Sequence, residues 1–241
     1  MEKVAAYLPA MLGGLWITVL VAGLSILGCA VVSVALGVLR TVRRSPARLV
    51  SGAVIELVRG GSVIIYLFWV YYALPVIPGA PQLSPLVAAV LVLSLGGGAY
   101  GAEIVRGGIE AVPRGQLEAC QALGLSRFHA LALVVLPQAL SQIVPGFASL
   151  AVDMVKWTSI VSFVGVQDVF YAANTARAVT NETVLVYLLL VLAYFVLCFA
   201  ASLLFRAVEL ALPLSRAARA GRGLADAGFF RAPASAEPMA S

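Results

Sequence analysis

Three acidic residues precede a basic residue by three positions, each time within or beside an apolar stretch. The pairs are Glu56 with Arg59, Glu103 with Arg106, and Asp153 with Lys156. Residues three apart share one face of a helix, so each pair can neutralise its charges locally. A lone charge near the centre of a bilayer costs at least about 2.5 kcal/mol, whereas a paired or water-facing charge costs less. Local neutralisation is therefore one interpretation of all three pairs.

The pair Asp153 and Lys156 also allows a second interpretation. It lies in an apolar segment that Pro145 interrupts, and polar residues follow it directly. A donor and an acceptor in a partly dehydrated cavity can hold a zwitterionic solute. We therefore predict a substrate pathway lined by Glu103, Asp153, Lys156, Trp157, Thr158 and Ser159. Both interpretations of the Asp153 and Lys156 pair remain open at this point.

Other kinds of chemistry find little support in the sequence. The single histidine, His129, cannot form a His-rich metal site, and the three cysteines lack the spacing of a metal site or a disulfide framework. The chain has no Gly-rich loop ending in Lys-Ser or Lys-Thr, so we expect it to bind no ATP itself. No metal or other cofactor is expected in this chain.

A cluster of glycines resembles a dinucleotide-binding pattern but lies inside an apolar run. That pattern requires a strand, a turn and a helix in a parallel sheet, which an apolar membrane segment does not supply. Small residues let helices approach closely. We therefore predict a helix-packing surface formed by Gly96, Gly97, Gly98 and Gly101.

The composition indicates the elements that must position these residues. Of 241 residues, 62% are apolar and 11% are charged, whereas an ordinary soluble domain has roughly 45–50% and 25%. About 20 apolar residues span the hydrocarbon core, so the chain has room for five or six crossings and no large soluble domain. The sequence predicts an all-α integral membrane protein whose energy source is a separate chain.

Five apolar runs are predicted to cross the membrane, at about residues 15–39, 50–74, 85–105, 136–170 and 183–210. Arginines collect after the first and last runs, at positions 40–48 and 206–231, and basic residues favour the cytoplasmic side. We therefore expect the N-terminus outside and the C-terminus inside. Residues 1–212 are predicted to form the transmembrane domain, and residues 213–241 a disordered cytoplasmic tail.

A polar loop at about residues 106–137 joins the third and fourth crossings. Residues 116–123 are predicted to form a short amphipathic helix, and Gly124 permits a turn after it. The motif Glu118-Ala119-Cys120, with Gly124 and later Leu136-Pro137, resembles the Glu-Ala-Ala signature of permease subunits of ATP-binding-cassette importers. Cys120 replaces the usual second alanine. The resemblance implies an ATPase-coupling site formed by Gln116, Glu118, Ala119, Cys120 and Gly124.

Three further motifs resemble the polar amino acid (histidine/glutamine/arginine-type) branch of that family. They are Val-Arg-Gly-Gly-Ser at 58–62, Gly-Ala-Tyr-Gly-Ala-Glu-Ile-Val-Arg-Gly-Gly-Ile at 98–109, and Lys-Trp-Thr-Ser-Ile at 156–160. The branch usually has Thr-Pro in place of Gly61-Ser62 and Asp in place of Trp157, so both departures fall where substrate is expected to pass. Residues 66–71 with Leu74-Pro75 also resemble ectoine importers.

The resemblance implies a type I importer permease (MetI-like) fold and a multi-pass location in the bacterial cytoplasmic (inner) membrane. It implies a transport subunit for a polar amino acid or amino-acid-like solute and no enzymatic activity. The expected partners are a second permease copy or paralogue, an ATPase dimer that holds ATP and Mg²⁺, an extracytoplasmic solute-binding protein and membrane lipid, without nucleic acid. An ectoine or compatible-solute importer is the alternative, and an ion-coupled secondary transporter a distant one.

Overall fold

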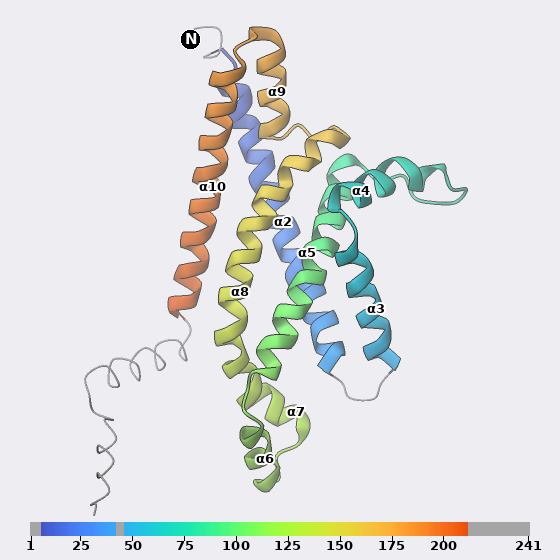
Figure 1. Cartoon of the computed structure of the whole chain (residues 1–241), viewed down its shortest axis with the longest axis vertical. Helices are drawn as coiled ribbons and strands as arrows, with labels where there is room; N and C mark the ends of the chain where they lie inside the picture. Colours follow the sequence, from blue (N-terminus) through green and yellow to red (C-terminus); the bar gives the residue numbers. More distant parts are fainter. Residues whose placement is uncertain (1–5, 42–45, 212–241) are drawn as a thin grey trace, which may run out of the picture.

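The computed structural model describes residues 6–41 and 46–211, and this part of the chain is helical and contains no strand (Figure 1). Its elements are α2 (Leu8–Thr41), α3 (Pro46–Gly60), α4 (Val63–Phe68), η1 (Trp69–Ala73), η2 (Leu74–Val76), α5 (Pro85–Glu110), α6 (Arg114–Ala122), α7 (Arg127–Ala130), η3 (Leu131–Val135), α8 (Leu136–Trp157), η4 (Thr158–Val164), α9 (Val169–Thr180) and α10 (Thr183–Ala211). The predicted disordered tail, 213–241, and most of the predicted cytoplasmic arginines lie outside the described residues.

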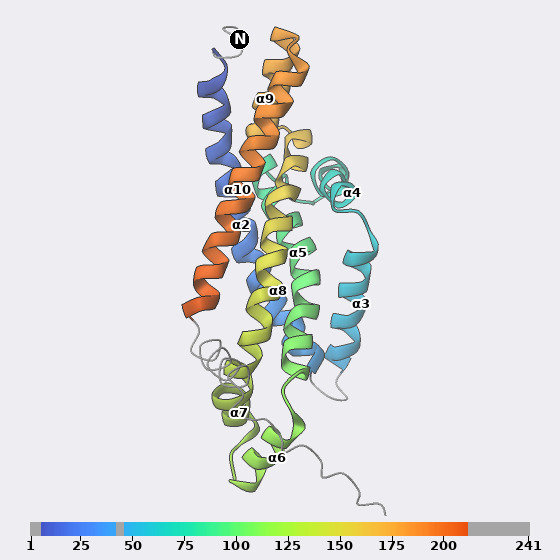
Figure 2. The ribbon, with the colours of Figure 1, turned by 60° about the vertical axis from the view of Figure 1, so that its left-hand side comes forward.

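Four helical segments among the described residues are long and apolar enough to cross a membrane. They are Leu8–Thr41, Pro85–Glu110, Leu131–Val164 and Thr183–Ala211. These segments run side by side along the long axis, with α6 and α7 at one end and the start of α2 and α9 at the other (Figures 1 and 2). The prediction of an all-α membrane protein with about five crossings is confirmed, and the second crossing is a bent pair of helices.

The second predicted crossing, 50–74, is sharply bent in the structure. It consists of Pro46–Gly60 and Val63–Val76, which meet at a 99° bend. The backbone of Ser62 is extended at the bend, and the Tyr66 hydroxyl donates a hydrogen bond to the Leu57 carbonyl across it, at 2.6 Å. The Tyr66 ring fills the space beside Gly61, where any larger side chain would collide with it. Glycine thus lets the chain turn, and the returning tyrosine pairs the Leu57 carbonyl near the end of α3.

The fourth predicted crossing, 136–170, is shifted toward the N-terminus and spans Leu131–Val164, with Pro145 inside the helix. It ends at Gly165, whose φ of +87° lies in the left-handed region that glycine adopts readily. The polar stretch that follows contains α9 (Val169–Thr180). Its N-cap is Asp168, whose Oδ1 accepts a hydrogen bond from the Tyr171 amide at 2.9 Å.

Helix α5 is the central helix, and glycines let three neighbours approach it. A methyl group on Gly97 would lie 2.8 Å from the Met154 sulfur of α8, and one on Gly98 would collide with Val32 of α2. A methyl group on Gly101 would collide with Ser33 of α2, whereas one on Gly96 would touch Val63 of α4. All four glycines are buried, so the face that they form is occupied by packed helices.

Candidate coupling loop and substrate pathway

Helix α6 ends in a glycine turn that gives the loop a defined shape. Gly124 has φ +72°, and its amide donates to the Gln121 carbonyl at 3.0 Å. The Leu125 amide donates to the Cys120 carbonyl, also at 3.0 Å. This pair of bonds is a Schellman motif, which satisfies the last carbonyls of a helix and requires a left-handed residue after its C-cap. A β-branched residue at position 124 would be strained there.

The side chains of α6 divide into an anchored and an outward group. The side chain of Cys120 is buried, and the residue is 4% exposed. Gln116, Glu118 and Ala119 are exposed. Leu123 is 78% exposed, so the tip of the loop presents apolar as well as polar surface. A surface of this kind can dock against a partner while the buried cysteine holds the helix to its own chain.

The loop passes without a break into the fourth membrane segment. Ser126 caps α7, because its hydroxyl accepts a hydrogen bond from the His129 amide at 3.3 Å. From there α7, the π-helix η3 and α8 follow one another directly, as Arg127–Ala130, Leu131–Val135 and Leu136–Trp157. Together they form one continuous helical rod from the loop into the membrane segment. π-Helical turns inside α-helices often mark functional sites.

Two of the predicted pathway residues form an exposed ion pair on this rod. Lys156 Nζ lies 3.1 Å from Asp153 Oδ1, and the two side chains are 59% and 53% exposed. Both belong to the segment that is apolar enough to span a membrane. An ion pair so exposed at this position requires water or another chain beside it.

The neighbouring predicted residues differ from one another in accessibility. Thr158 is buried, and its hydroxyl donates to the Val155 carbonyl at 2.7 Å. Ser159 is half-buried, and its hydroxyl donates to the Lys156 carbonyl at 2.9 Å. Both hydroxyl protons are therefore engaged by the backbone of the same helix. In this arrangement the two hydroxyl groups can offer a solute only oxygen lone pairs.

Trp157 belongs to an aromatic row that the sequence analysis missed. Its ring centroid lies 5.9 Å from that of Tyr100 on α5, and the Arg59 guanidinium of α3 lies 5.1 Å from the centroid of Tyr100. Tyr100 was visible in the sequence only as part of a family motif. The row connects α3, α5 and α8. Its centroid distances fall within the roughly 4.5–7 Å typical of aromatic pairs and the roughly 6 Å limit of cation–π contacts.

Glu103, which was predicted to line the pathway, is held by two arginines. Its carboxylate bonds to Arg40 of α2 and to Arg106 one turn along α5. The neighbouring Ile104 packs beside Gly146 of α8, two helical turns before Asp153. Among the described residues, Glu103 pairs with Arg106 and Asp153 with Lys156, but Glu56 forms no ion pair with Arg59.

Asp168 is a fully buried carboxyl group that lies between the spanning segments Leu131–Val164 and Thr183–Ala211. Its Oδ2 and the Tyr194 hydroxyl are both buried, and the hydroxyl lies near enough to interact with the carboxyl group. Burial raises the pKa of Asp168 from its ordinary value of 3.8 to about 6, although hydrogen bonds from the backbone oppose the shift. The sequence contained no signal that this residue is buried.

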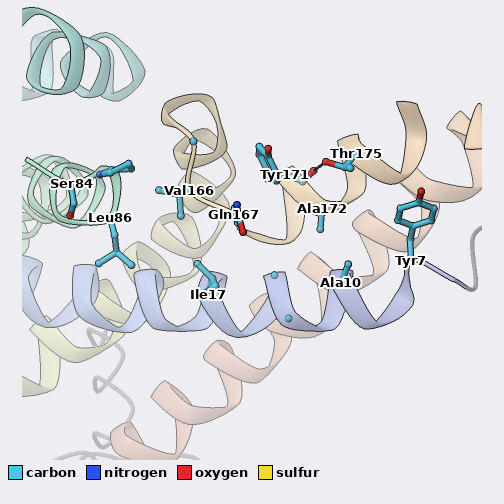
Figure 3. A pocket seen from close by; sticks show the side chains of 14 residues that line it. Tyr7, Ala10, Ile17, Ser84, Leu86, Val166, Gln167, Tyr171, Ala172 and Thr175 are labelled. Atoms are coloured by element: carbon cyan, nitrogen blue, oxygen red, sulfur yellow. Dashed lines mark hydrogen bonds between the residues drawn. The ribbon is translucent and has the colours of Figure 1, made fainter. Parts of the chain in front are cut away.

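A cavity of about 670 Å³ opens between α2, the start of α5 and α9, at the end of the molecule opposite the coupling loop (Figure 3). On one side it is lined by Tyr7, just before α2, and by Ile17 of α2, and on the other side by Gln167 and Tyr171. None of the described residues that line it is charged. A zwitterionic solute would lose its hydration there without gaining an ion pair, so the cavity is poorly suited to such cargo.

The bundle of spanning helices with a structured loop at one end defines a multi-pass membrane protein. The chain belongs to the family described as binding-protein-dependent transport system inner membrane components, whose model matches residues 4–212. Members of this family are membrane components of transport systems, and the match agrees with the resemblance that the sequence motifs indicated.

Individual relatives agree with this assignment. The chain is 39% identical over 207 residues to a probable amino-acid ABC transporter permease of Sinorhizobium fredii, covering 84% of this chain and 87% of that one. It resembles a crystal structure of an amino acid ABC transporter with histidines, with TM-score 0.78, 29% identity, and coverage of 85% and 95%. An inward-facing methionine ABC transporter shares the fold, with TM-score 0.67, 24% identity, and coverage of 82% and 95%. The ABC importer permease fold is thereby confirmed.

Proposed function

We propose that this chain is the permease subunit through which an ATP-binding-cassette importer moves a polar amino acid or amino-acid-like solute across the bacterial inner membrane. The observation that carries the proposal is the continuous rod from the coupling loop to the exposed pair Asp153 and Lys156. It links a surface suited to docking with charged groups suited to a zwitterion. The amino-acid transporters among the relatives support the choice of cargo.

In this proposal the partner ATPase holds ATP and Mg²⁺, and α6 docks against it. Gln116, Glu118 and Ala119 supply the outward surface, Cys120 anchors it, and Gly124 sets the turn. Closure of the ATPase dimer moves the loop as a rigid body, and the rod carries that motion into the membrane. A second permease copy or paralogue completes the pathway, and an extracytoplasmic binding protein delivers the solute.

The pathway is proposed to run past Asp153, Lys156 and Trp157. Lys156 can attract a carboxylate and Asp153 an ammonium group, and both interactions strengthen where water is scarce. Thr158 and Ser159 flank this point; Ser159, which is half-buried, can offer its oxygen as an acceptor, whereas Thr158 is buried and supports the helix. Glu103 was predicted to line the same pathway, and its two guanidinium partners suggest a different task, which is developed below.

Transport by the reconstituted complex tests the proposal. The chain, its ATPase and its second permease are placed in proteoliposomes with the binding protein, and uptake of polar amino acids and compatible solutes is measured. We expect uptake that requires ATP and the binding protein. Uptake driven by an ion gradient without ATP would overturn the proposal and favour a secondary transporter.

A further inference from the structure

The carboxylate of Glu103 is shared between two helices. Its Oε1 lies 2.5 Å from the guanidinium Nη1 of Arg40 on α2. Its Oε2 accepts a hydrogen bond from Arg106 Nε at 2.9 Å and lies 2.8 Å from Arg106 Nη2. The Glu103 side chain is 21% exposed, and those of the two arginines are 23% and 32% exposed. Both oxygens of the carboxylate are thus engaged by guanidinium groups in a partly desolvated position.

Arg40 also lies against a third helix, α3. A methyl group on Gly52 of α3 would lie 3.8 Å from the Arg40 guanidinium carbon, so the guanidinium rests against the α3 backbone. One turn earlier on α2, a methyl group on Gly37 would lie 2.9 Å from the Ala102 carbonyl of α5. The ends of α2 and α5 nearest the coupling loop and the neighbouring part of α3 therefore meet closely around one partly buried ion-pair group.

The ion pairs continue toward the coupling loop. Arg106 also pairs with Glu110 at 2.5 Å, and Glu110 is the last residue of α5. Helix α6 begins four residues later, at Arg114. The chain of charges Arg40–Glu103–Arg106–Glu110 thus runs from α2 to the base of the loop. The loop is connected to α8 by the rod on one side and to α2, α3 and α5 by these ion pairs on the other.

We propose that Glu103 is a positioning residue that fastens the ends of α2, α3 and α5 into one body moving with the coupling loop, and that it does not bind cargo. This inference rests on the proposed function. Removing the carboxylate leaves Arg40 and Arg106 side by side without their counter-charge, so the helix ends separate. ATP closure then moves the loop without moving all three helices together, and hydrolysis continues with less transport.

The number of ATP molecules hydrolysed per solute transported tests the proposal in the reconstituted complex. For Glu103→Gln we expect this ratio to rise roughly tenfold, which equals about 1.4 kcal/mol of lost coupling. Arg40→Gln should raise it similarly, and the double variant should be no worse than the worse single variant, because both remove one interaction. Glu56→Gln, an exposed carboxylate on α3, is the matched control and should keep the wild-type ratio.

Three outcomes would overturn the proposal. The first is a lower yield of folded complex with an unchanged ratio per folded molecule, which indicates a structural role alone. The second is a changed substrate affinity or selectivity with an unchanged ratio, which indicates a cargo ligand. The third is a double variant whose effect is the product of the two single effects, which indicates that the residues act independently.

A spectroscopic measurement keeps the inference testable if the proposed transport function fails. Spin labels are placed at Leu39→Cys on α2 and Gly107→Cys on α5, two exposed positions near the ion pairs, after Cys198 is replaced by serine. We expect a narrow distance distribution in the otherwise native chain and a broad one with Glu103→Gln. Identical distributions would overturn the inference, whereas a lack of uptake by the wild-type complex would overturn only the proposed function.

Discussion

Replacing Asp168 with asparagine should remove a pH dependence of stability that the buried carboxyl group creates. Asparagine keeps a side-chain oxygen that can accept the Tyr171 amide as N-cap of α9, so the local fold is preserved. It removes the ionisation that burial disfavours. The comparison of the two proteins therefore isolates the charge of Asp168.

The sign and size of the effect follow from the pKa of Asp168. Burial raises this pKa from 3.8 to about 6, so the folded protein binds the proton more tightly than the unfolded chain does. The free energy of unfolding of the wild-type protein should therefore fall as the pH rises from about 4 to about 6, and level off above that. The difference between the two pKa values corresponds to about 3 kcal/mol.

Thermal unfolding of the purified protein in detergent, followed between pH 4 and pH 8, measures this effect. At pH 4 the wild-type and Asp168→Asn proteins should unfold at similar temperatures, and at pH 7.5 the variant should unfold several degrees higher. Glu182→Gln, an exposed carboxyl group before α10, is the control and should follow the wild type at every pH. A wild-type unfolding temperature that does not fall between pH 4 and pH 6, or a variant that falls in parallel with it, would refute the reasoning.

Three further predictions concern the transport cycle. Gly124→Val should raise ATP consumption per solute transported, because its φ of +72° suits glycine, and Gly124→Asn should be milder; normal coupling in the valine variant would show that the turn is dispensable. In intact cells, Ala80→Cys should react with an impermeant thiol reagent from outside while Ala47→Cys should not, and the opposite labelling would reverse the proposed orientation. Lys156→Met should change substrate affinity or selectivity in the complex. Wild-type uptake kinetics per folded molecule would show that Lys156 only neutralises the charge of Asp153.

Composition and length were sufficient to predict the membrane class and four of the crossings. They did not predict the bend in the second crossing, because hydropathy averaged over a long window is insensitive to the short stretch Arg-Gly-Gly-Ser at 59–62, where the chain turns. The turn depends on Tyr66 returning to the Leu57 carbonyl, a contact between residues nine apart. Helix α9 was not predicted, because a helix of 12 residues is too short to cross a membrane and polar residues interrupt its apolar ones.

Local spacing predicted ion pairs within one helix but could not predict those between helices. Glu103 and Arg106 do pair, as their separation of three suggests. The bond from Glu103 to Arg40 joins residues 63 apart in the sequence, and no periodicity indicates it. That one bond changes the interpretation of Glu103, because a carboxylate held by two guanidinium groups has little remaining capacity for a cargo ammonium group.

The two groups of charged residues within the spanning helices therefore differ in what satisfies them. Glu103 is surrounded by cations of its own chain and needs nothing further. Asp153 and Lys156 satisfy each other at 3.1 Å but remain more than half exposed in a segment whose composition suits lipid. A pair left against hydrocarbon would keep most of its desolvation cost, so its surroundings in the membrane must be water or protein. Such a surface fits a permease that is completed by a second subunit around an aqueous path.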